Sequence, residues 1–165
     1  MADASVADGA GAIMGHYPND PFAGPTQKIE YFLRLADHVA VPVVAYLRSD
    51  EATIADLVRL SAHDNIAAVK FAAPNPLKLA EAIRSTAQHD TVWVCGLAEG
   101  WAPSFYAAGA RGFTSGLVNV FPEISLAIWS ALEAGDYPAA REQINRIVDF
   151  EDMRTLSTTV PMSPW

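Results

Sequence analysis

The sequence predicts an α/β fold in which parallel strands alternate with helices. Short apolar runs recur along the chain, and the segments between them have helical periodicity. Regular alternation of this kind is typical of parallel strands joined by right-handed helical crossovers. We expect about five strands, from the apolar runs at 12–14, 41–46, 66–71, 91–95 and 112–117.

The segments between these runs carry helix signals. Ile29, Phe32, Leu33 and Ala36 fall on one helical face, which indicates an amphipathic helix packed on the sheet. Helix starts are marked by capping residues, and helix ends by glycines that favour a left-handed conformation. In chain order these signals are Thr53 with Asp56, Asn75 before Pro76, Gly109, Gly135, and Asp136 at the start of the last long helix.

Length and composition bound the class of protein. The 165 residues fit one domain, expected at 1–156, followed by a short tail at 157–165. Hydrophobic residues make up 51% and charged residues 18%, which favours a packed globular protein over a disordered one. The net charge of -8 disfavours nucleic acid as a partner, because phosphate binding needs clustered lysine and arginine.

Cysteine usage and hydropathy indicate the compartment. Cys95 is the only cysteine, so we expect neither an intrachain disulfide nor a cysteine metal site. No apolar stretch approaches the length of a membrane span, and residues 1–9 lack the features of a secretion signal. A cytoplasmic protein with no membrane association is the expectation.

Lys70 ends an otherwise apolar run, and this placement is the strongest chemical signal. Burial disfavours the ammonium and lowers the pKa of a lysine toward the neutral amine. A neutral amine attacks ketones and forms Schiff bases, which withdraw electrons from the adjacent carbon. The alternative is a structural lysine whose head reaches water while its stem covers apolar surface.

Ligands of parallel sheets gather at the carboxyl ends of the strands, and polar residues follow several of the predicted strands. Lys70 would share that edge with Tyr46, Arg48 and Thr114. His16 is expected there too, as a substrate contact or as a structural residue. The convergence of an amine, a phenol, a guanidinium and a hydroxyl favours a catalytic role for Lys70.

Several segments resemble the class I aldolase superfamily typified by dihydrodipicolinate synthase and N-acetylneuraminate lyase. The run 66–70 is similar to the strand that carries the family's Schiff-base lysine, and 43–46 to the strand that ends in its proton-relay tyrosine. Residues 9–14 and the glycine-rich stretch 108–119 resemble the family's fourth and eighth strands. The resemblance implies a partial (β/α)8 TIM barrel whose strands correspond to strands 4–8.

The resemblance implies a Schiff-base lyase, an aldolase or a dehydratase, that acts on a 2-keto acid without a metal or organic cofactor. Lys70 would be the nucleophile and Tyr46 the proton relay, with Thr114 and Gly116 beside the substrate. The arginine two positions after the tyrosine, Arg48, resembles the dehydratase branch that acts on keto-deoxy sugar acids. Its guanidinium would bind a sugar-acid carboxylate or form a surface ion pair with Asp50 or Glu51.

The main departure from the family pattern is length, because the first three strands and the glycine-rich carboxylate-binding loop have no counterpart. A truncated product, a fragment that pairs with another copy and a misassigned start all fit this pattern. Open sheet edges make a homo-oligomer the expected state. The alternative function is an inactive barrel fragment with a structural or oligomerisation role. A receiver-type signalling module is disfavoured, since Met14 and His16 stand where its acids would be needed.

Overall fold

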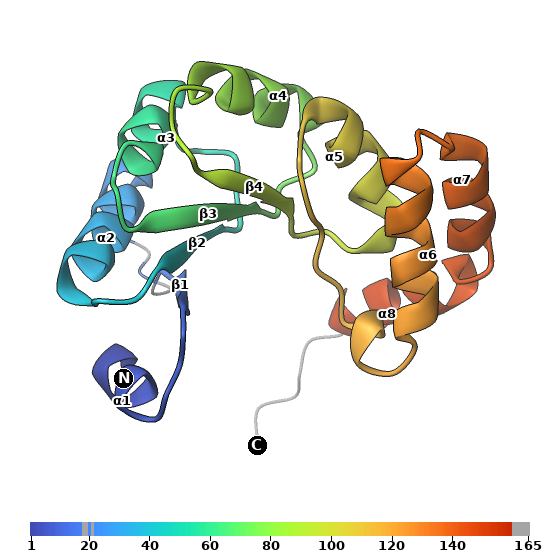
Figure 1. Cartoon of the computed structure of the whole chain (residues 1–165), viewed down its shortest axis with the longest axis horizontal. Helices are drawn as coiled ribbons and strands as arrows, with labels where there is room; N and C mark the ends of the chain where they lie inside the picture. Colours follow the sequence, from blue (N-terminus) through green and yellow to red (C-terminus); the bar gives the residue numbers. More distant parts are fainter. Residues whose placement is uncertain (18–19, 21, 160–165) are drawn as a thin grey trace. The chain divides into compact units, whose positions relative to one another are not determined.

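The chain forms two compact units, residues 1–114 and residues from 115 onwards, in a computed structural model that describes residues 1–17, 20 and 22–159. The first unit alternates strands and helices, and the second is helical (Figure 1). The elements of the first unit are α1 (Ala2–Ala7), β1 (Ile13–His16), α2 (Pro25–His38), β2 (Val43–Leu47), α3 (Ile54–Ser61), β3 (Ile66–Phe71), α4 (Pro76–Ser85), β4 (Val92–Cys95), the 3-10 turn η1 (Glu99–Trp101) and α5 (Ala102–Ala108).

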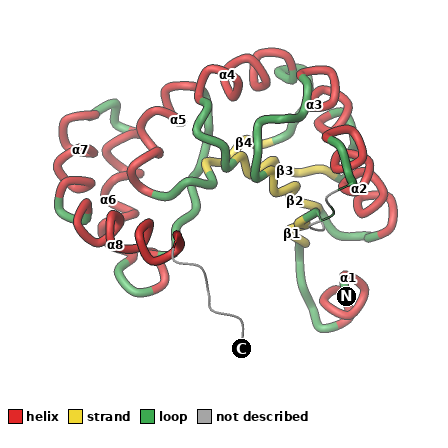
Figure 2. Tube along the Cα trace, turned by 180° about the vertical axis from the view of Figure 1, so that it is seen from behind, coloured by secondary structure: helices red, strands yellow, loops and turns green. Residues whose placement is uncertain are grey.

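The four strands form one parallel sheet in the order β1-β2-β3-β4, which confirms the predicted α/β class. Figure 2 shows the strands as a curved layer with α2, α3 and α4 along one side. Each strand is followed by a helix that returns the chain to the same end of the sheet. The carboxyl ends of all four strands therefore lie at the same end of the sheet.

The fifth predicted strand, 112–117, is reduced to one bridge. Phe113 pairs in parallel with Cys95, and the backbone N–H of Thr114 donates to the Cys95 carbonyl at 2.9 Å. The pairing stops because the chain turns at Ser115, whose hydroxyl accepts a hydrogen bond from the Leu117 N–H at 2.9 Å. Leu117 then begins the 3-10 turn η2 (Leu117–Asn119) instead of extending the sheet.

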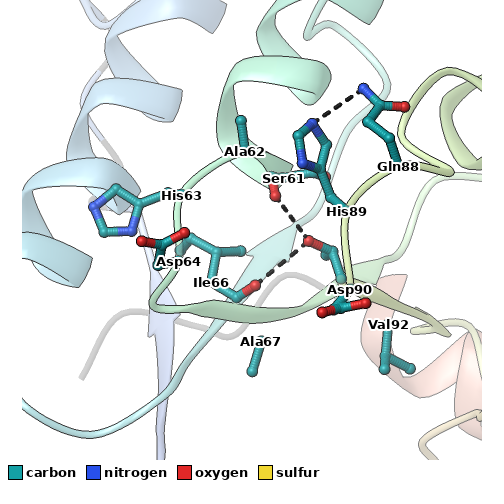
Figure 3. A pocket seen from close by; sticks show the side chains of 11 residues that line it. Ser61, Ala62, His63, Asp64, Ile66, Ala67, Gln88, His89, Asp90 and Val92 are labelled. Carbon is teal, nitrogen blue, oxygen red and sulfur yellow. Dashed lines mark hydrogen bonds between the residues drawn. The ribbon is translucent and has the colours of Figure 1, made fainter.

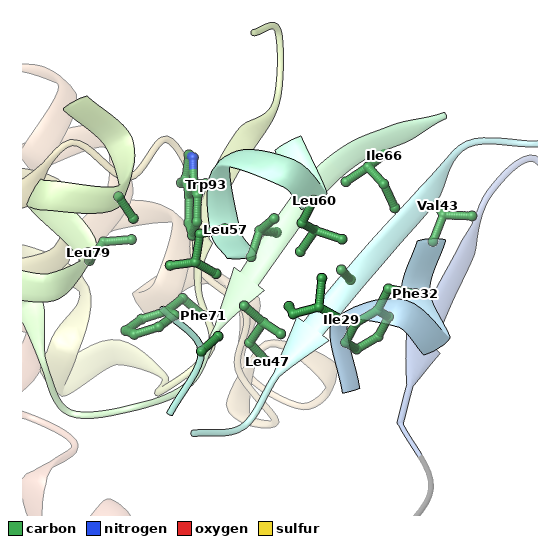
Figure 4. Close-up of a cluster of buried hydrophobic side chains, with 14 of the residues drawn as sticks. Ile29, Phe32, Val43, Leu47, Leu57, Leu60, Ile66, Phe71, Leu79 and Trp93 are labelled. Carbon is green, nitrogen blue, oxygen red and sulfur yellow. The ribbon is translucent and has the colours of Figure 1, made fainter. Parts of the chain in front are cut away.

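The core of the first unit lies between the sheet and the helices on one face. Along β2, Val43, Ala45 and Leu47 are buried, while the residues between them are only half-buried. The helices bring apolar side chains onto this face, as the predicted amphipathic pattern requires. Figure 4 shows this cluster, which includes Ile29, Phe32, Leu57, Leu60, Leu79 and Trp93.

A β-bulge at Ala67 decides which face of the sheet Lys70 occupies. The register runs from Val43 opposite Ile66 to Val44 opposite Ala68, so Ala67 is an extra residue in β3. Ile66 and Phe71 are buried on the helix side of this strand, and Lys70 between them is half-buried. In a regular strand Ile66 and Lys70 would share a face, because residues four apart point the same way.

The predicted helix signals are largely confirmed. Thr53 and Asp56 form a reciprocal capping box at the start of α3, and the Asn75 side chain accepts a hydrogen bond from the Lys78 N–H at 3.0 Å. Gly109 ends α5 with φ 113°, a left-handed conformation that glycine adopts without steric cost.

The second unit consists of η2, α6 (Pro122–Glu133), α7 (Tyr137–Asn145) and α8 (Val148–Thr159). Gly135 has φ 72° after α6, and Asp136 caps α7 through the Ala139 N–H at 3.0 Å. Asp136 does not open the last long helix, because α8 follows α7. The boundary at 156/157 between a domain and a tail stays a prediction, and residues 160–165 lie outside the described range.

Asn65 ties the connection between α2 and β2 to the start of β3. Its side-chain amide nitrogen lies within hydrogen-bond distance of the carbonyl oxygens of Ala36 (2.9 Å), Val39 (2.8 Å) and Val41 (3.1 Å). These carbonyls belong to the end of α2 and the loop that leads into β2. One amide therefore fixes the return of α2 against the start of β3.

We predict that Asn65→Ala lowers the free energy of unfolding by about 1–3 kcal/mol, since it leaves half-buried carbonyls without their donor. Urea denaturation measures the change. Asn119→Ala is the matched control, because it removes an exposed bond of 3.2 Å to the Gly116 carbonyl. Equal effects of the two substitutions would contradict a special role for Asn65.

Candidate active site

One row of residues crosses the sheet near the carboxyl ends of its strands. In the strand register His16 lies opposite Tyr46, Tyr46 opposite Lys70, and Lys70 opposite Val94. These positions alternate with the residues that the helices bury, so they belong to the face that α2, α3 and α4 do not cover. The row brings two predicted site residues, Lys70 and Tyr46, into contact.

The Lys70 amine lies over the Tyr46 ring, with Nζ 4.1 Å from the ring centroid. Burial lowers the pKa of Lys70 below its ordinary 10.5, and a weaker charge interaction with Cys95 raises it. The Tyr46 ring favours the ammonium, by roughly 0.5–1 kcal/mol where such a contact is exposed. Burial and the ring thus act in opposite directions on the amine, and burial is the main cause of the lowered pKa.

Cys95 does not supply a negative partner for this amine. Burial raises the pKa of the Cys95 thiol to about 11. The thiol is therefore protonated near neutral pH and behaves as a small apolar side chain. The thiol therefore offers the Lys70 ammonium no negative charge near neutral pH, and burial, which favours the free amine, is left opposed by the Tyr46 ring.

The loop after β4 shapes the space around the lysine stem. A Cβ atom at Gly96 would lie 2.7 Å from the Ala72 Cβ and 3.1 Å from Cγ and Cε of Lys70. Glycine at this position therefore leaves room for the stem. Two residues later Ala98 has φ 66° and ψ -164°, a conformation used almost only by glycine, at a cost of roughly 1–3 kcal/mol. Such strain is concentrated at functional sites in proteins.

His16 is a neighbour of Tyr46 that sequence reasoning left undecided. The two rings meet edge to face, with centroids 4.6 Å apart. His16 is exposed, and it lies on the far side of Tyr46 from Lys70 in the strand order. The sequence signal for this contact is that His16 follows the first apolar run, just as Tyr46 ends the second.

The remaining predicted site residues differ in their placement. Thr114 is half-buried and bonded through its backbone N–H to Cys95, so it lies beside the carboxyl end of β4. Arg48 is exposed just beyond β2. The acids proposed as its ion-pair partners have other contacts: Glu51 pairs with Lys28 at 2.8 Å, and Asp50 accepts from Asn75 at 2.8 Å.

Gly116 belongs to the second unit, where it is exposed and precedes η2. Its predicted place beside the substrate stays a prediction.

A separate hollow of about 600 Å³ lies at the amino ends of β3 and β4, away from the Lys70 row (Figure 3). The loops after α3 and α4 form it, and the Thr91 hydroxyl lies 3.1 Å from the Ser61 carbonyl and 3.4 Å from that of Ile66. Parallel α/β sheets bind their ligands at the opposite, carboxyl end. The Lys70 row is therefore the better candidate site.

Within the described residues, no group of three histidine, cysteine, aspartate or glutamate side chains is arranged to hold a metal ion. The described helices also include none that is both long and apolar enough to cross a bilayer.

Comparisons with known proteins agree on one family. The sequence profile of the dihydrodipicolinate synthetase family matches residues 2–163. A 4-hydroxy-tetrahydrodipicolinate synthase of Methanosarcina mazei is 28% identical over 145 residues, which cover 86% of this chain and 48% of that protein. A second relative, 4-hydroxy-tetrahydrodipicolinate synthase 1 of Streptomyces coelicolor, is 32% identical over 143 residues, with 82% and 43% covered.

Solved structures of the same family also match this chain. Dihydrodipicolinate synthase from Bacillus clausii matches with a TM-score of 0.87 and 37% identity, over 92% of this chain and 52% of that one. The enzyme from Oceanobacillus iheyensis matches with a TM-score of 0.87 and 32% identity, over 92% and 51%. The chain thus spans about half the length of the relatives it matches. The expectation of a partial barrel is confirmed, with four strands and one bridge instead of five strands.

We predict opposite titration shifts for two of the three lysines of the chain. Lys70 should titrate below 10.5 because it is partly desolvated, whereas the hydrogen bond from Lys28 to Glu51 raises the pKa of Lys28. Competitive acetylation across a pH series, read by mass spectrometry, measures both values. An unshifted Lys70 beside a raised Lys28 would contradict the proposed environment of the Lys70 amine.

Proposed function

Because this chain belongs to the dihydrodipicolinate synthetase family, we propose that its Lys70 row is the catalytic centre of a Schiff-base lyase that acts on a 2-keto acid. The observation that carries the proposal is the contact between the Lys70 amine and the Tyr46 ring, 4.1 Å from amine to centroid, combined with the lowered pKa of Lys70. An amine that loses its proton more readily is a better nucleophile near neutral pH, and a phenol beside it can carry protons.

In the proposed reaction, neutral Lys70 attacks the C2 carbonyl carbon of the keto acid and forms a carbinolamine. The former carbonyl oxygen leaves as water, and an iminium remains between Nζ and C2. The iminium accepts the electron pair of a neighbouring bond, so that a C3 proton is lost or a C3–C4 bond breaks. Tyr46 is proposed to transfer the protons that these steps release and consume.

Substrate contacts are proposed for three further residues. The exposed Arg48 guanidinium beyond β2 suits the distal carboxylate of a sugar acid, and Thr114 offers a hydroxyl beside β4. By the family resemblance, Gly116 is proposed to leave space for a substrate longer than pyruvate. Pyruvate and a keto-deoxy sugar acid are the two proposed substrate types. The sugar acid would be cleaved by retro-aldol reaction or dehydrated, whereas the pyruvate iminium would lose a C3 proton and give an enamine. The relatives named above are synthases, so the dehydratase branch rests on Arg48 alone.

We predict that borohydride reduction in the presence of pyruvate adds one reduced pyruvate to Lys70. Lys28 and Lys78 serve as internal controls, because their ammonium groups are held by Glu51 and by the Asp50 carbonyl. Peptide mass spectrometry locates the adduct, and Lys70→Met should abolish it. An unmodified Lys70, or an adduct spread equally over the three lysines, would reject the proposed mechanism.

We predict that Tyr46→Phe separates proton transfer from Schiff-base formation. The phenyl ring keeps the surface over which the amine lies, while the loss of the hydroxyl should slow the exchange of pyruvate methyl protons with deuterated water by about 10²–10⁴-fold. Proton NMR follows the exchange, and the borohydride adduct on Lys70 should persist. Tyr106→Phe is the control, since Tyr106 lies on α5 beside Arg111. Equal exchange rates in the two variants would remove Tyr46 from the mechanism.

A further inference from the structure

The sheet face that α2, α3 and α4 leave uncovered carries a row of apolar residues next to the Lys70 row. In the strand register Met14 lies opposite Val44, Val44 opposite Ala68, and Ala68 opposite Val92. Met14 and Val92, at the two ends of this row, are each 44% exposed. Parallel sheets are almost always covered on both faces, so an exposed apolar row of this kind indicates a surface that another layer covers.

Both edges of the same sheet are also open among the described residues. β1 pairs with β2 on one side and with no described strand on the other. At the opposite edge, the short segment around Phe113 makes a single bridge to Cys95. Unpaired strand edges present free N–H and C=O groups that pair readily with another strand.

We propose that this face and its two edges bind a second copy of this chain, related by a two-fold axis parallel to the strands. A rotation about such an axis keeps the strand direction, so β1 of each copy lies parallel to the Phe113 segment of its partner. One self-complementary contact is thus made twice and closes both edges.

The composition of the face fits a second copy better than a charged partner. The four strands carry no aspartate or glutamate, and their ionisable side chains on this face are His16, Tyr46 and Lys70. A strongly acidic or basic surface would find little opposite charge there. The two exposed ends of the apolar row, Met14 and Val92, lie at opposite edges of the sheet, where the rotation brings β1 of one copy toward the β4 edge of the other.

Closure would complete the site as well as the sheet. The partner's sheet would form the wall facing the row of His16, Tyr46 and Lys70, which the described residues of one first unit leave open. The inference concerns assembly and does not depend on Schiff-base chemistry. Its test is therefore a mass measurement, and pyruvate trapping in the same samples bears only on the proposed function.

Sedimentation equilibrium of the purified chain over a range of micromolar concentrations should give twice the 17.7 kDa mass of one chain. Val92→Glu should raise the dimer dissociation constant by about 100-fold or more, because closure would bury an unpaired carboxylate. Met14→Glu tests the opposite edge in the same way. Leu77→Glu is the matched control: Leu77 is 82% exposed on α4, and its substitution should leave the dimer intact.

Circular dichroism of each variant checks that the fold is retained. Loss of the dimer in the folded Val92→Glu and Met14→Glu proteins, with the dimer kept in Leu77→Glu, supports the proposal. A single-chain mass for the unaltered protein, a mass above two chains, or a dimer that both face substitutions leave intact overturns it. A chain that is monomeric alone and binds a different polypeptide through this face overturns it equally.

Discussion

The register of the parallel strands is the constraint on which the candidate site depends. Alternation along each strand sends one set of residues into the helix-packed core and the next set to the other face. In β3 this arrangement requires the bulge at Ala67, since without it Lys70 and Ile66 would share a face. The extra residue lets Ile66 stay in the core while Lys70 meets Tyr46. An irregularity in strand pairing thus positions the proposed nucleophile.

The environment of Lys70 has a measurable consequence for stability. Burial lowers the pKa of Lys70 in the folded chain, so the folded state binds this proton more weakly than the unfolded chain does. The unfolded state therefore carries more protons at pH values between the folded pKa and about 10.5. Over that window the contribution of Lys70 to the free energy of unfolding rises with pH. Below it, the partly desolvated ammonium costs stability, a cost that the contact with the Tyr46 ring reduces.

The sequence predicted local features better than long-range ones. The capping box of Thr53 with Asp56 and the left-handed Gly109 follow from residue types at short spacing, and both are present. The proximity of Lys70 and Tyr46 followed from their equivalent positions at the ends of two adjacent strands.

Features that depend on three-dimensional packing were harder to predict. The bulge at Ala67 could not be recognised from the sequence, because Ala67 is followed by a second alanine. The shortened fifth strand depends on a turn that the Ser115 hydroxyl stabilises. Gly96 approaches the stem of Lys70 closely, but the two residues belong to neighbouring strand segments. The spacing of residues within one segment therefore could not predict this contact. Its glycine was visible in the sequence, but the steric reason for it was not.

The proposed assembly and the proposed chemistry share one surface. The apolar row ending in Met14 and Val92 lies two residues along each strand from the row of His16, Tyr46 and Lys70. A layer that covered the first row would exclude water from the second and lower the pKa of Lys70 further.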